Sequence, residues 1–505
     1  MFDTQQVLSQ FQIQPVHGGA CTGSGGWSAT QDRQVFAAVN PADGTVTARV
    51  AGATAQDYEA VMATAAVAHK RWRMVPAPRR GELVARIGEL AEAHLDALAA
   101  VVTLDTGKSL MEAKGEVREL IDMATLAAGQ SRMLYGFTQQ SQRAKHRMYD
   151  QWLPLGVVGV ISAYNFPAAV WAQNGFLAAI GGNTVVWKPS PKVPLTALAL
   201  QHLSNQAMRE MGFEGVFTLF IPEDNQVAEL LVADPRAALI SFTGSSAVGR
   251  KVADIVGGTL GRRYMLERSG NNGCIVDETA DLKLAARSIT FGAVGTTGQR
   301  CTSTRRVIAQ RTVVGELVEL LKQSFAQIKV GDPRDAGTVV GPLVDAHFEA
   351  AIAEATEAGG RVVFGGKRID RPGHYVEPTL ITQVQPEWRC VQHETFAPIV
   401  YVMAYDTLEE AIEIHNGVPQ GLASGIHSSN LGNIELFLSA QGSDCGIAKV
   451  NMGTTGADIG AAFGGEKETG GGRTAGSDAW KGYMRRQSVC INWGGESPWD
   501  GRIKL

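Results

Sequence analysis

The pattern of apolar positions changes near residue 155. Before that point, between 54 and 135, apolar side chains recur every three or four residues, which is the spacing of amphipathic helices. The positions that carry this period are Val61, Ala65, Ala68, Trp72, Leu83, Ile87, Ala91, Leu95 and Leu98. Asp105-Thr106-Gly107-Lys108 interrupts it. We therefore predict a largely helical region over 54–135 with a break at this segment.

The helix expected after the break carries four acidic residues on closely spaced turns. They are Glu112, Glu116, Glu119 and Asp122. A run of this kind is typical of a helix face in contact with solvent. From the pattern alone we expect that face to be exposed.

After residue 155, short apolar runs alternate with segments of helical period. The runs predict strands at 157–162, 184–188, 216–221 and 238–242. The intervening segments predict helices over 168–180, from about 195, over 227–232 and from 244. This alternation indicates a parallel α/β sheet with right-handed crossovers. Ligands of such sheets bind at the carboxyl ends of the strands.

Three of these strand ends carry unusual residues. The first is followed by Tyr164-Asn165-Phe166-Pro167, the second by Lys188-Pro189-Ser190, and the last by the turn Gly244–Gly249. A glycine turn that opens a helix suits a phosphate, because free backbone N–H groups and the helix dipole point at it. The turn is not GxGxxG, so a plain strand-to-helix turn is the alternative interpretation.

The C-terminal half reads as a second α/β unit. We expect helices over 317–328 and 408–416, and strands over 362–364 and 378–381. His393-Glu394-Thr395-Phe396-Ala397-Pro398 lies between the last strand and the last helix. Glycines gather in 462–473, where a flexible linker and a loop that closes over a site are both open interpretations.

Composition narrows the class of protein. The chain has 505 residues, enough for two or three domains, and a formal net charge of -4 with no basic block, which disfavours nucleic acid as a partner. No apolar run reaches the roughly 18 residues of a membrane helix, and no secretory signal is visible. The six cysteines are widely spaced and form no CxxC pair, so we expect neither a metal site nor disulfides, and a cytoplasmic location.

One cysteine has the surroundings of a nucleophile. Cys301 lies in Gly298-Gln299-Arg300-Cys301-Thr302, with Arg305 and Arg306 just beyond. Nearby positive charge favours a reactive thiolate. The alternative is a buried cysteine that packs as a small apolar side chain.

Several short motifs occur in an order that resembles the NAD(P)-dependent aldehyde dehydrogenase superfamily. They are Asn165-Phe166-Pro167, Lys188-Pro189-Ser190, Phe242-Thr243-Gly244-Ser245, Glu267, Gly298-Gln299-Arg300-Cys301, Glu394-Thr395-Phe396-Ala397-Pro398 and Phe463-Gly464-Gly465. Gly442-Ser443-Asp444-Cys445-Gly446 and 469–481 further resemble its antiquitin branch, which oxidises α-aminoadipate semialdehyde in lysine breakdown. The likeness runs through nearly the whole chain.

The resemblance implies an α/β fold with a Rossmann-like, parallel-sheet NAD-binding domain, a second α/β catalytic domain and a small oligomerisation arm. The corresponding segments are 1–137 with 155–267, 268–480, and 138–154 with 481–505. It implies a homo-oligomer, a dimer or a tetramer, and no metal. Alternation in 146–152 fits an edge strand that needs a partner, and we hypothesise a dimer of dimers.

The resemblance also implies roles for single residues. Cys301 would attack the aldehyde, Glu267 would act as the general base, and the Asn165 side chain with the Cys301 backbone N–H would hold the oxyanion. Those expected to bind NAD are Lys188, Ser190, Gly244, Ser245, Gly249, Glu394 and Phe396. Those expected to bind the substrate are Glu119, Phe166, Arg300, Gly456, Ala457 and Phe463. For Glu119 a solvated surface position, and for Arg300 a structural ion pair, are the alternatives.

The chain departs from the family pattern at three places. Arg268-Ser269 stand where a leucine and a glycine are usual, so Arg268 would either lower the pKa of Glu267 or face solvent. Pro191 stands where many relatives have an acidic residue that would repel a 2′-phosphate, so the expected preference for NAD is modest. Trp171 and Gln173 differ from the usual aromatic pattern of the branch.

Other functions stay open at this point. The enzyme could act on another aliphatic or aromatic aldehyde. A non-redox thiol enzyme would need a histidine paired with the thiol, for which His393 is the one candidate. A non-catalytic protein of the same fold would not need Cys301, Glu267 and Asn165 together.

Overall fold

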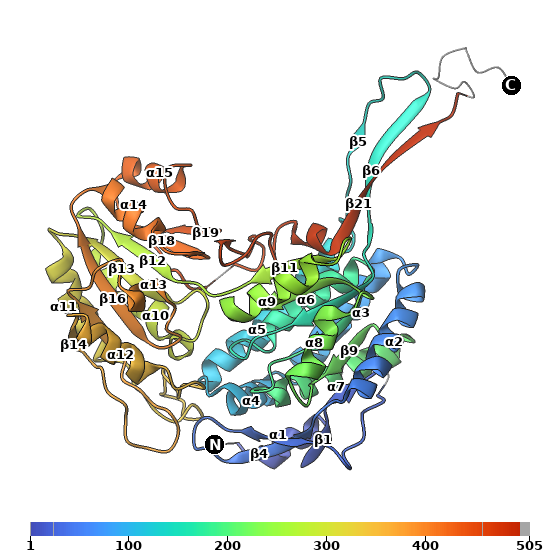
Figure 1. The fold of residues 1–505 in the computed structure, drawn as a ribbon, viewed down its shortest axis with the longest axis horizontal. Helices are drawn as coiled ribbons and strands as arrows, with labels where there is room; N and C mark the ends of the chain where they lie inside the picture. Colours follow the sequence, from blue (N-terminus) through green and yellow to red (C-terminus); the bar gives the residue numbers. More distant parts are fainter. Residues whose placement is uncertain (1, 24, 457, 495–505) are drawn as a thin grey trace.

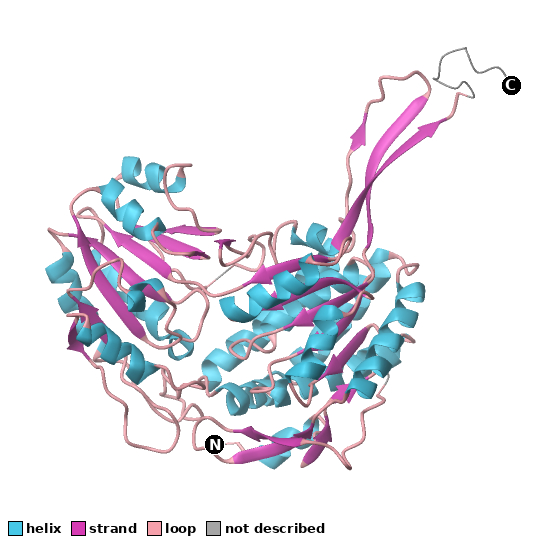
Figure 2. Cartoon of the chain, viewed as in Figure 1, coloured by secondary structure: helices cyan, strands magenta, loops and turns pink. Residues whose placement is uncertain are grey.

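The computed structural model, which describes residues 2–23, 25–456 and 458–494, has two α/β lobes and a projecting arm (Figure 1). Figure 2 shows strands in the interior of each lobe and helices around them. The α/β class predicted from the sequence is confirmed. The proposed domain boundaries stay a prediction, because sheets and helices alone do not fix them.

The first lobe begins with short elements and a helical region. The short elements are α1 (Thr4–Gln10), β1 (Val16–Gly18), β2 (Ala20–Cys21), β3 (Val35–Val39) and β4 (Val46–Ala51). The helices are α2 (Ala55–Trp72), α3 (Ala77–Ala93), α4 (Leu95–Thr106) and α5 (Leu110–Gln130). The break predicted at 105–108 is confirmed, because Gly107 ends α4 with a φ of 72°.

A six-stranded sheet forms the centre of this lobe, in the order β11-β10-β7-β8-β9-β2. Its strands after β2 are β7 (Val157–Ile161), β8 (Thr184–Lys188), β9 (Phe217–Phe220), β10 (Ala237–Thr243) and β11 (Arg263–Glu267). These five are parallel to one another, as predicted. The chain runs outward from β7 to β8 and β9 and then returns to the other side of β7 as β10, so the strand order reverses between β7 and β10. Such a switch point leaves a crevice at the carboxyl ends of the strands.

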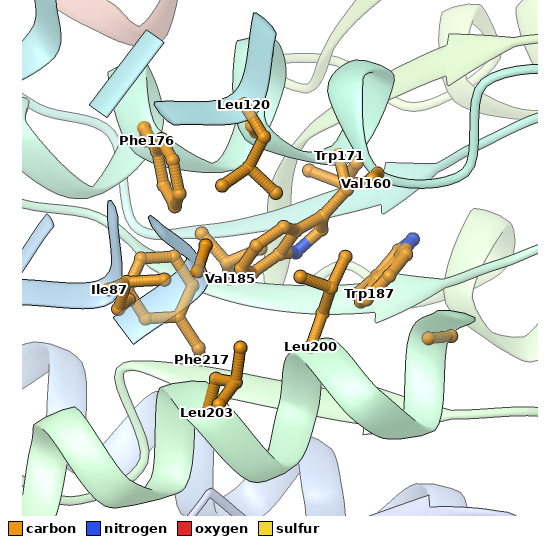
Figure 3. Packing of buried hydrophobic residues seen from close by; sticks show 14 of the residues in the cluster. Ile87, Leu120, Val160, Trp171, Phe176, Val185, Trp187, Leu200, Leu203 and Phe217 are labelled. Atoms are coloured by element: carbon orange, nitrogen blue, oxygen red, sulfur yellow. The ribbon is translucent and has the colours of Figure 1, made fainter. Parts of the chain in front are cut away.

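The helices of this sheet are also where the sequence predicts them. They are α6 (Ala169–Ile180), α7 (Pro194–Met211), α8 (Asn225–Ala233) and α9 (Ser246–Gly257). Between sheet and helices lies an aromatic core in which Trp171 stacks on Trp187 at 4.9 Å between ring centroids (Figure 3). Burial of these rings holds the crevice edge of the sheet in a fixed position.

The second lobe contains a seven-stranded sheet in the order β14-β15-β16-β13-β12-β18-β19. The strands are β12 (Asn272–Val276), β13 (Thr304–Gln310), β14 (Arg361–Phe364), β15 (Thr379–Thr382), β16 (Ile399–Tyr405), β18 (Ala423–His427) and β19 (Ile447–Val450). Its helices are α10 (Leu282–Val294), α11 (Val314–Phe325), α12 (Phe348–Glu357), α13 (Arg389–Gln392), α14 (Leu408–Asn416) and α15 (Leu431–Leu438). Short elements complete it: η1 (Gly295–Gly298), β17 (Gln420–Gly421) and β20 (Glu466–Lys467), whereas η2 (Ala479–Tyr483) packs against α6 of the first lobe.

The arm is a three-stranded antiparallel sheet that leaves the first lobe (Figure 1). It consists of β5 (Thr138–Gln139), β6 (His146–Pro154) and β21 (Met484–Asn492), in the order β21-β6-β5. The outer edges of β5 and β21 pair with no other described strand. Within the described part of the chain, no helix is both long and apolar enough to cross a membrane.

The acidic face predicted on α5 is only partly a solvated face. Asp122 is exposed, whereas Glu116 is buried and forms an ion pair with buried Lys108 at 2.5 Å. Glu112 pairs with Arg300 at 2.9 Å, and Glu119 lines a cavity. The expectation of a fully exposed face is therefore wrong, because α5 packs against α3 and α6 rather than at the surface.

Candidate active site

A cavity of about 580 Å³ lies in the crevice at the carboxyl ends of β7, β8, β10 and β11. The predicted site residues that line it are Glu119, Asn165, Phe166, Lys188, Ser190, Gly244, Ser245, Glu267, Arg300, Cys301, Glu394, Phe396, Gly456 and Phe463. Gly249 does not line it, and Ala457 lies outside the described residues. The fold thus brings together residues that are up to 344 positions apart in the sequence, from Glu119 to Phe463.

Cys301 and Glu267 meet in the middle of this cavity. Glu267 ends β11 and is 3% exposed, and burial raises the pKa of its carboxyl group to about 8. The Cys301 thiol lines the cavity beside this carboxyl group, whose Oε1 is buried without a hydrogen-bond partner among the described residues. Burial, followed by the charges of Glu267 and Glu394, raises the pKa of the thiol well above its ordinary value. At neutral pH the thiol holds its proton, so it needs a base before it can attack.

This result corrects the expectation that the arginines near Cys301 favour its thiolate. Arg305 donates to the carbonyl oxygens of Gly298, Arg300 and Thr395 at 3.0, 3.1 and 2.5 Å. Arg306 likewise donates to backbone carbonyls, at Asn271 and in α14. Arg305 therefore fixes the backbone of the cysteine loop and Arg306 that of Asn271 and α14, while the carboxylates raise the pKa of the thiol.

The cysteine loop adopts an unusual backbone conformation. Thr296 and Thr297 have φ angles of 50° and 56°, and Gly298 has a φ of 69°. A Cβ on Gly298 would lie 2.4 Å from the carbonyl carbon of Ala397, so only glycine fits there. This close approach places the segment before Cys301 against the segment after Phe396.

Asn165 faces the same point from the end of β7. Its side-chain Nδ2 donates to the backbone carbonyl oxygen of Gln299 at 2.9 Å. The backbone carbonyl oxygen of Asn165 accepts from Lys108 Nζ at 2.6 Å. The side chain is 6% exposed and is fixed beside Cys301. It leaves a second amide hydrogen for a ligand in the cavity.

One end of the cavity lies at the start of α9. Ser245 caps the helix by accepting from Val248 N–H at 3.4 Å, and the first turn contains no acidic residue. Lys188, at the end of β8, donates only to the carbonyl oxygen of Pro189 at 3.0 Å, and burial lowers its pKa to about 8. Glu394 pairs with Arg305 at 3.4 Å, and burial raises its pKa to about 6.

The opposite end lies against α5 and α6. Glu119 Oε1 accepts from Gln173 Nε2 at 2.7 Å, and burial, with the charge of Glu116, raises the pKa of Glu119 to about 7. The solvated alternative for Glu119 is therefore wrong. Arg300 forms an ion pair with Glu112, the alternative role that the sequence left open for it. Its guanidinium also lies 5.6 Å from the Phe166 ring. It still lines the cavity.

Some residues that support the site were not predicted from the sequence. Lys108 and Glu116 form a buried pair, and Glu116 also accepts from Ala168 N–H at 2.7 Å, which fixes the start of α6. Tyr164 packs edge-on against Phe396 at 6.0 Å between ring centroids. Only their positions beside recognised motifs could have suggested them.

Two alternatives from the sequence find no support. The glycine-rich segment 462–473 is not a free linker, because Thr469 O accepts from Arg268 N–H at 2.8 Å and Phe463 pairs with Ala475. His393 is exposed and contacts Arg389 O at 3.1 Å, and among the described residues no histidine lines the cavity. The thiol therefore has no imidazole to activate it.

The α9 end fits a phosphate-bearing cofactor. A Cβ on Gly244 would lie 2.8 Å from the Phe242 ring, and one on Gly249 would lie 2.4 Å from Arg268 Cδ, so the turn stays open only with glycines. Lys188 and Arg268 line this end without a carboxylate partner among the described residues. Cationic side chains beside a helix N-terminus bind anions such as a pyrophosphate.

Comparison with known proteins agrees with this geometry. Residues 27–489 match the model of the aldehyde dehydrogenase family. "Aldehyde dehydrogenase family 7 member A1" of Pisum sativum is 45% identical over 91% of this chain and 91% of its own length. "Alpha-aminoadipic semialdehyde dehydrogenase" of Mus musculus is 42% identical over 95% of this chain and 90% of its own.

Solved structures agree in the arrangement of the whole chain. The NAD-dependent aldehyde dehydrogenase of Sinorhizobium meliloti superposes with a TM-score of 0.91 at 28% identity, covering 97% of each chain. An NADP-dependent enzyme of E. coli superposes with a TM-score of 0.90 at 30% identity, covering 96% of this chain and 99% of its own. These two proteins use different dinucleotides.

Proposed function

The chain belongs to the aldehyde dehydrogenase family, and we propose that it oxidises L-2-aminoadipate 6-semialdehyde, which cyclises to piperideine-6-carboxylate, in lysine breakdown. As a member of that family it is an enzyme that uses NAD(P) to oxidise small aldehydes. One observation carries the substrate assignment. The cavity that holds Cys301 and Glu267 ends on Glu119, a half-buried carboxyl group whose partner among the described residues is a neutral amide.

Cys301 is the proposed nucleophile, and Glu267 its base. The thiol gives its proton to Glu267 as the sulfur bonds to the aldehyde carbon, and the carbonyl oxygen becomes an oxyanion. The second amide hydrogen of Asn165 and the backbone N–H of Cys301 stabilise that charge. A base whose pKa is about 8 matches this task near neutral pH.

A dinucleotide held at the α9 end would supply the hydride acceptor, and loss of the hydride from the bound substrate would leave it as a thioester of Cys301. Glu267 releases the thiol's proton to solvent and then takes a proton from water, whose oxygen attacks the thioester carbon. The carbon–sulfur bond breaks, the proton on Glu267 returns to the sulfur, and the product acid loses its own proton to solvent and leaves as a carboxylate. Both half-reactions use the same carboxyl group, so burial of Glu267 serves each of them.

We assign the cofactor to the α9 end of the cavity. Lys188 and Glu394 would hold ribose hydroxyls, and Phe396 would pack beside the nicotinamide. Ser190 would contact the adenosine ribose, while the turn from Gly244 and Ser245 to Gly249 would accept the pyrophosphate. NAD is the proposed preference, because no arginine follows Lys188 to pair with a 2′-phosphate.

We assign the tail of the substrate to the α5 end. Glu119 would pair with its ammonium group, and Arg300, Gly456 and Ala457 would hold its carboxylate. The rings of Phe166 and Phe463 line the cavity between Cys301 and these anchors, where methylene groups would pack. A zwitterionic tail needs both anchors, since a buried unpaired charge is costly.

The test compares kcat/KM for aminoadipate semialdehyde, hexanal and benzaldehyde in the wild-type enzyme. We expect the zwitterionic aldehyde to be the best substrate. A preference for hexanal or benzaldehyde would refute the proposed substrate and favour another aliphatic or aromatic aldehyde.

We also propose that the arm makes the chain a homo-oligomer, a dimer or a dimer of dimers. The unpaired outer edges of β5 and β21, with Phe137 and Trp493 exposed near them, support this. The part of 481–505 beyond residue 494 lies outside the described residues. Light scattering at micromolar concentration should give two or four chain masses, and a monomer mass would refute the proposal.

A cytoplasmic location is the last part of the proposal. It is supported by six cysteines that form no disulfide, including the exposed Cys490. Fractionation of cells that produce the tagged protein would test it, and recovery outside the cytoplasmic fraction would refute it.

A further inference from the structure

Arg268 follows the base Glu267 directly, and its side chain turns away from that base. Its backbone N–H donates to Thr469 O at 2.8 Å, which fixes the residue at the end of β11. The stem then passes over the first turn of α9. A Cβ on Gly249 would lie 2.4 Å from Arg268 Cδ and 2.8 Å from its Cγ. The arginine stem therefore occupies a space that Gly249 leaves free.

This position corrects both expectations from the sequence. The pKa of Glu267 rises rather than falls, because burial and the charge of Glu394 outweigh the Cys301 thiol, which lowers it. The side chain of Arg268 does not simply face solvent either, because the residue is partly buried and lines the cavity. Arg268 therefore contributes to the cavity and not to the pKa of Glu267.

The guanidinium of Arg268 is uncommitted. Within the described part of the chain it has no ion pair or hydrogen bond, and its Nε is enclosed without a partner. Arg250, which follows Gly249 on α9, differs in both respects: its side chain is 64% exposed and pairs with Glu468 at 3.3 Å. An enclosed charged donor without an acceptor is unfavourable unless a ligand supplies one.

The surroundings of this guanidinium favour an anion. Arg268 lines the cavity together with Gly244, Ser245 and Val248, which belong to the turn and first residues of α9. That turn carries the positive end of the helix dipole and has no acidic residue. Two sources of positive potential therefore adjoin each other with no carboxylate between them.

We propose that Arg268 binds the pyrophosphate of the dinucleotide cofactor through charge-assisted hydrogen bonds, an inference that rests on the proposed function. The sheet order supports the pyrophosphate over a 2′-phosphate. Arg268 follows β11, which is next to β10 and the α9 turn, whereas Lys188 and Ser190 follow β8, three strands away. Three strand spacings are roughly 14 Å, beyond the reach of one arginine side chain.

The test measures ligand binding by calorimetry on the full-length protein, without turnover. The ligands are ADP-ribose, NAD and NADP, and the variants are Arg268→Leu, Arg268→Lys and the matched control Arg250→Leu. We expect Arg268→Leu to weaken all three ligands by a similar factor of roughly 10 to 100 and to reduce the salt dependence of binding. Arg268→Lys should recover part of the loss, and Arg250→Leu should bind as the wild type does.

Wild-type affinity of Arg268→Leu for ADP-ribose would overturn the inference. A loss confined to NADP would overturn it too, because it would place the guanidinium at a 2′-phosphate. If Arg268→Leu does not fold by circular dichroism, Arg268→Lys and Arg268→Gln decide by the same comparison. A wild-type protein that binds neither ADP-ribose nor NAD would instead refute the cofactor assignment of the proposed function.

Discussion

The two ends of the cavity leave opposite charges without a partner. At the α5 end the acidic groups Glu112 and Glu116 have cationic partners, but Glu119 has only the amide of Gln173. At the α9 end the cations Lys188 and Arg268 have no carboxylate partner in the described part of the chain. One end is thus prepared for a cation and the other for an anion.

The difference indicates the charge of the ligand group that each end of the cavity binds. Burial pushes each group towards its neutral form: it raises the pKa of Glu119 to about 7 and lowers that of Lys188 to about 8. A ligand of opposite charge stabilises the ionised form, so its binding offsets the free-energy cost of burying the charged group. Glu112 and Glu116 already have cationic partners within the protein. They position helices, and their charges do not indicate a ligand.

Removing the thiol between the two ends should have the largest effect. Cys301→Ala should lower kcat by about four decades or more, because among the described residues no other cysteine lines the cavity. It should leave the affinity for NAD unchanged, since the α9 end is intact. Steady-state rates and calorimetry check both parts. Retention of a tenth of the wild-type rate would remove Cys301 from the mechanism.

Glu267→Gln should have the next largest effect, roughly two to three decades in steady-state turnover. Glutamine keeps the shape but cannot take a proton, so stopped flow should show a burst of reduced cofactor followed by slow thioester hydrolysis. In the wild type only the deprotonated base is active, and its pKa is about 8. Turnover should therefore rise with pH up to about 8 and then level off.

The variant should lose this dependence on pH, which separates Glu267 from the other carboxyl groups. The matched control is Glu468→Gln, an exposed carboxylate whose ion pair with Arg250 lies outside the cavity. Unchanged turnover in Glu267→Gln would argue against its role as the base.

Glu119→Gln tests the α5 end, with an expected loss of roughly one to two decades in kcat/KM for the zwitterionic aldehyde. Hexanal, which has no ammonium group, should be oxidised as before. Below pH about 7 the wild-type carboxyl group gains a proton, so KM for the zwitterion should rise as the pH falls. An equal loss for both aldehydes would show that Glu119 has only a structural role.

The sequence predicted the helices and the parallel sheet, and most of the site residues predicted from it line the cavity. Those predictions rest on periodicity, on strand ends and on ordered motifs, which are local signals. The predictions were wrong where tertiary contacts decide whether a charged side chain is buried and which partner it has. The pattern of α5 cannot show that Glu116 is buried against Lys108, and the arginines beside Cys301 cannot be read as backbone donors until the loop is folded.

The smallest expected effect concerns the choice between NAD and NADP at the α9 end. Pro191 is exposed and follows Ser190, and the neighbouring cation Lys192 is already paired with Asp345. A carboxylate at 191 would repel a 2′-phosphate by about 1 kcal/mol at a partly solvated separation, so Pro191→Glu should raise the NAD-over-NADP ratio of kcat/KM about fivefold. Pro191→Ala, which adds no charge, should leave the ratio near the modest wild-type value. If Pro191→Glu weakened NAD and NADP equally, the 2′-hydroxyl would not lie at this strand end, and the division of the cofactor between β8 and α9 would have to be revised.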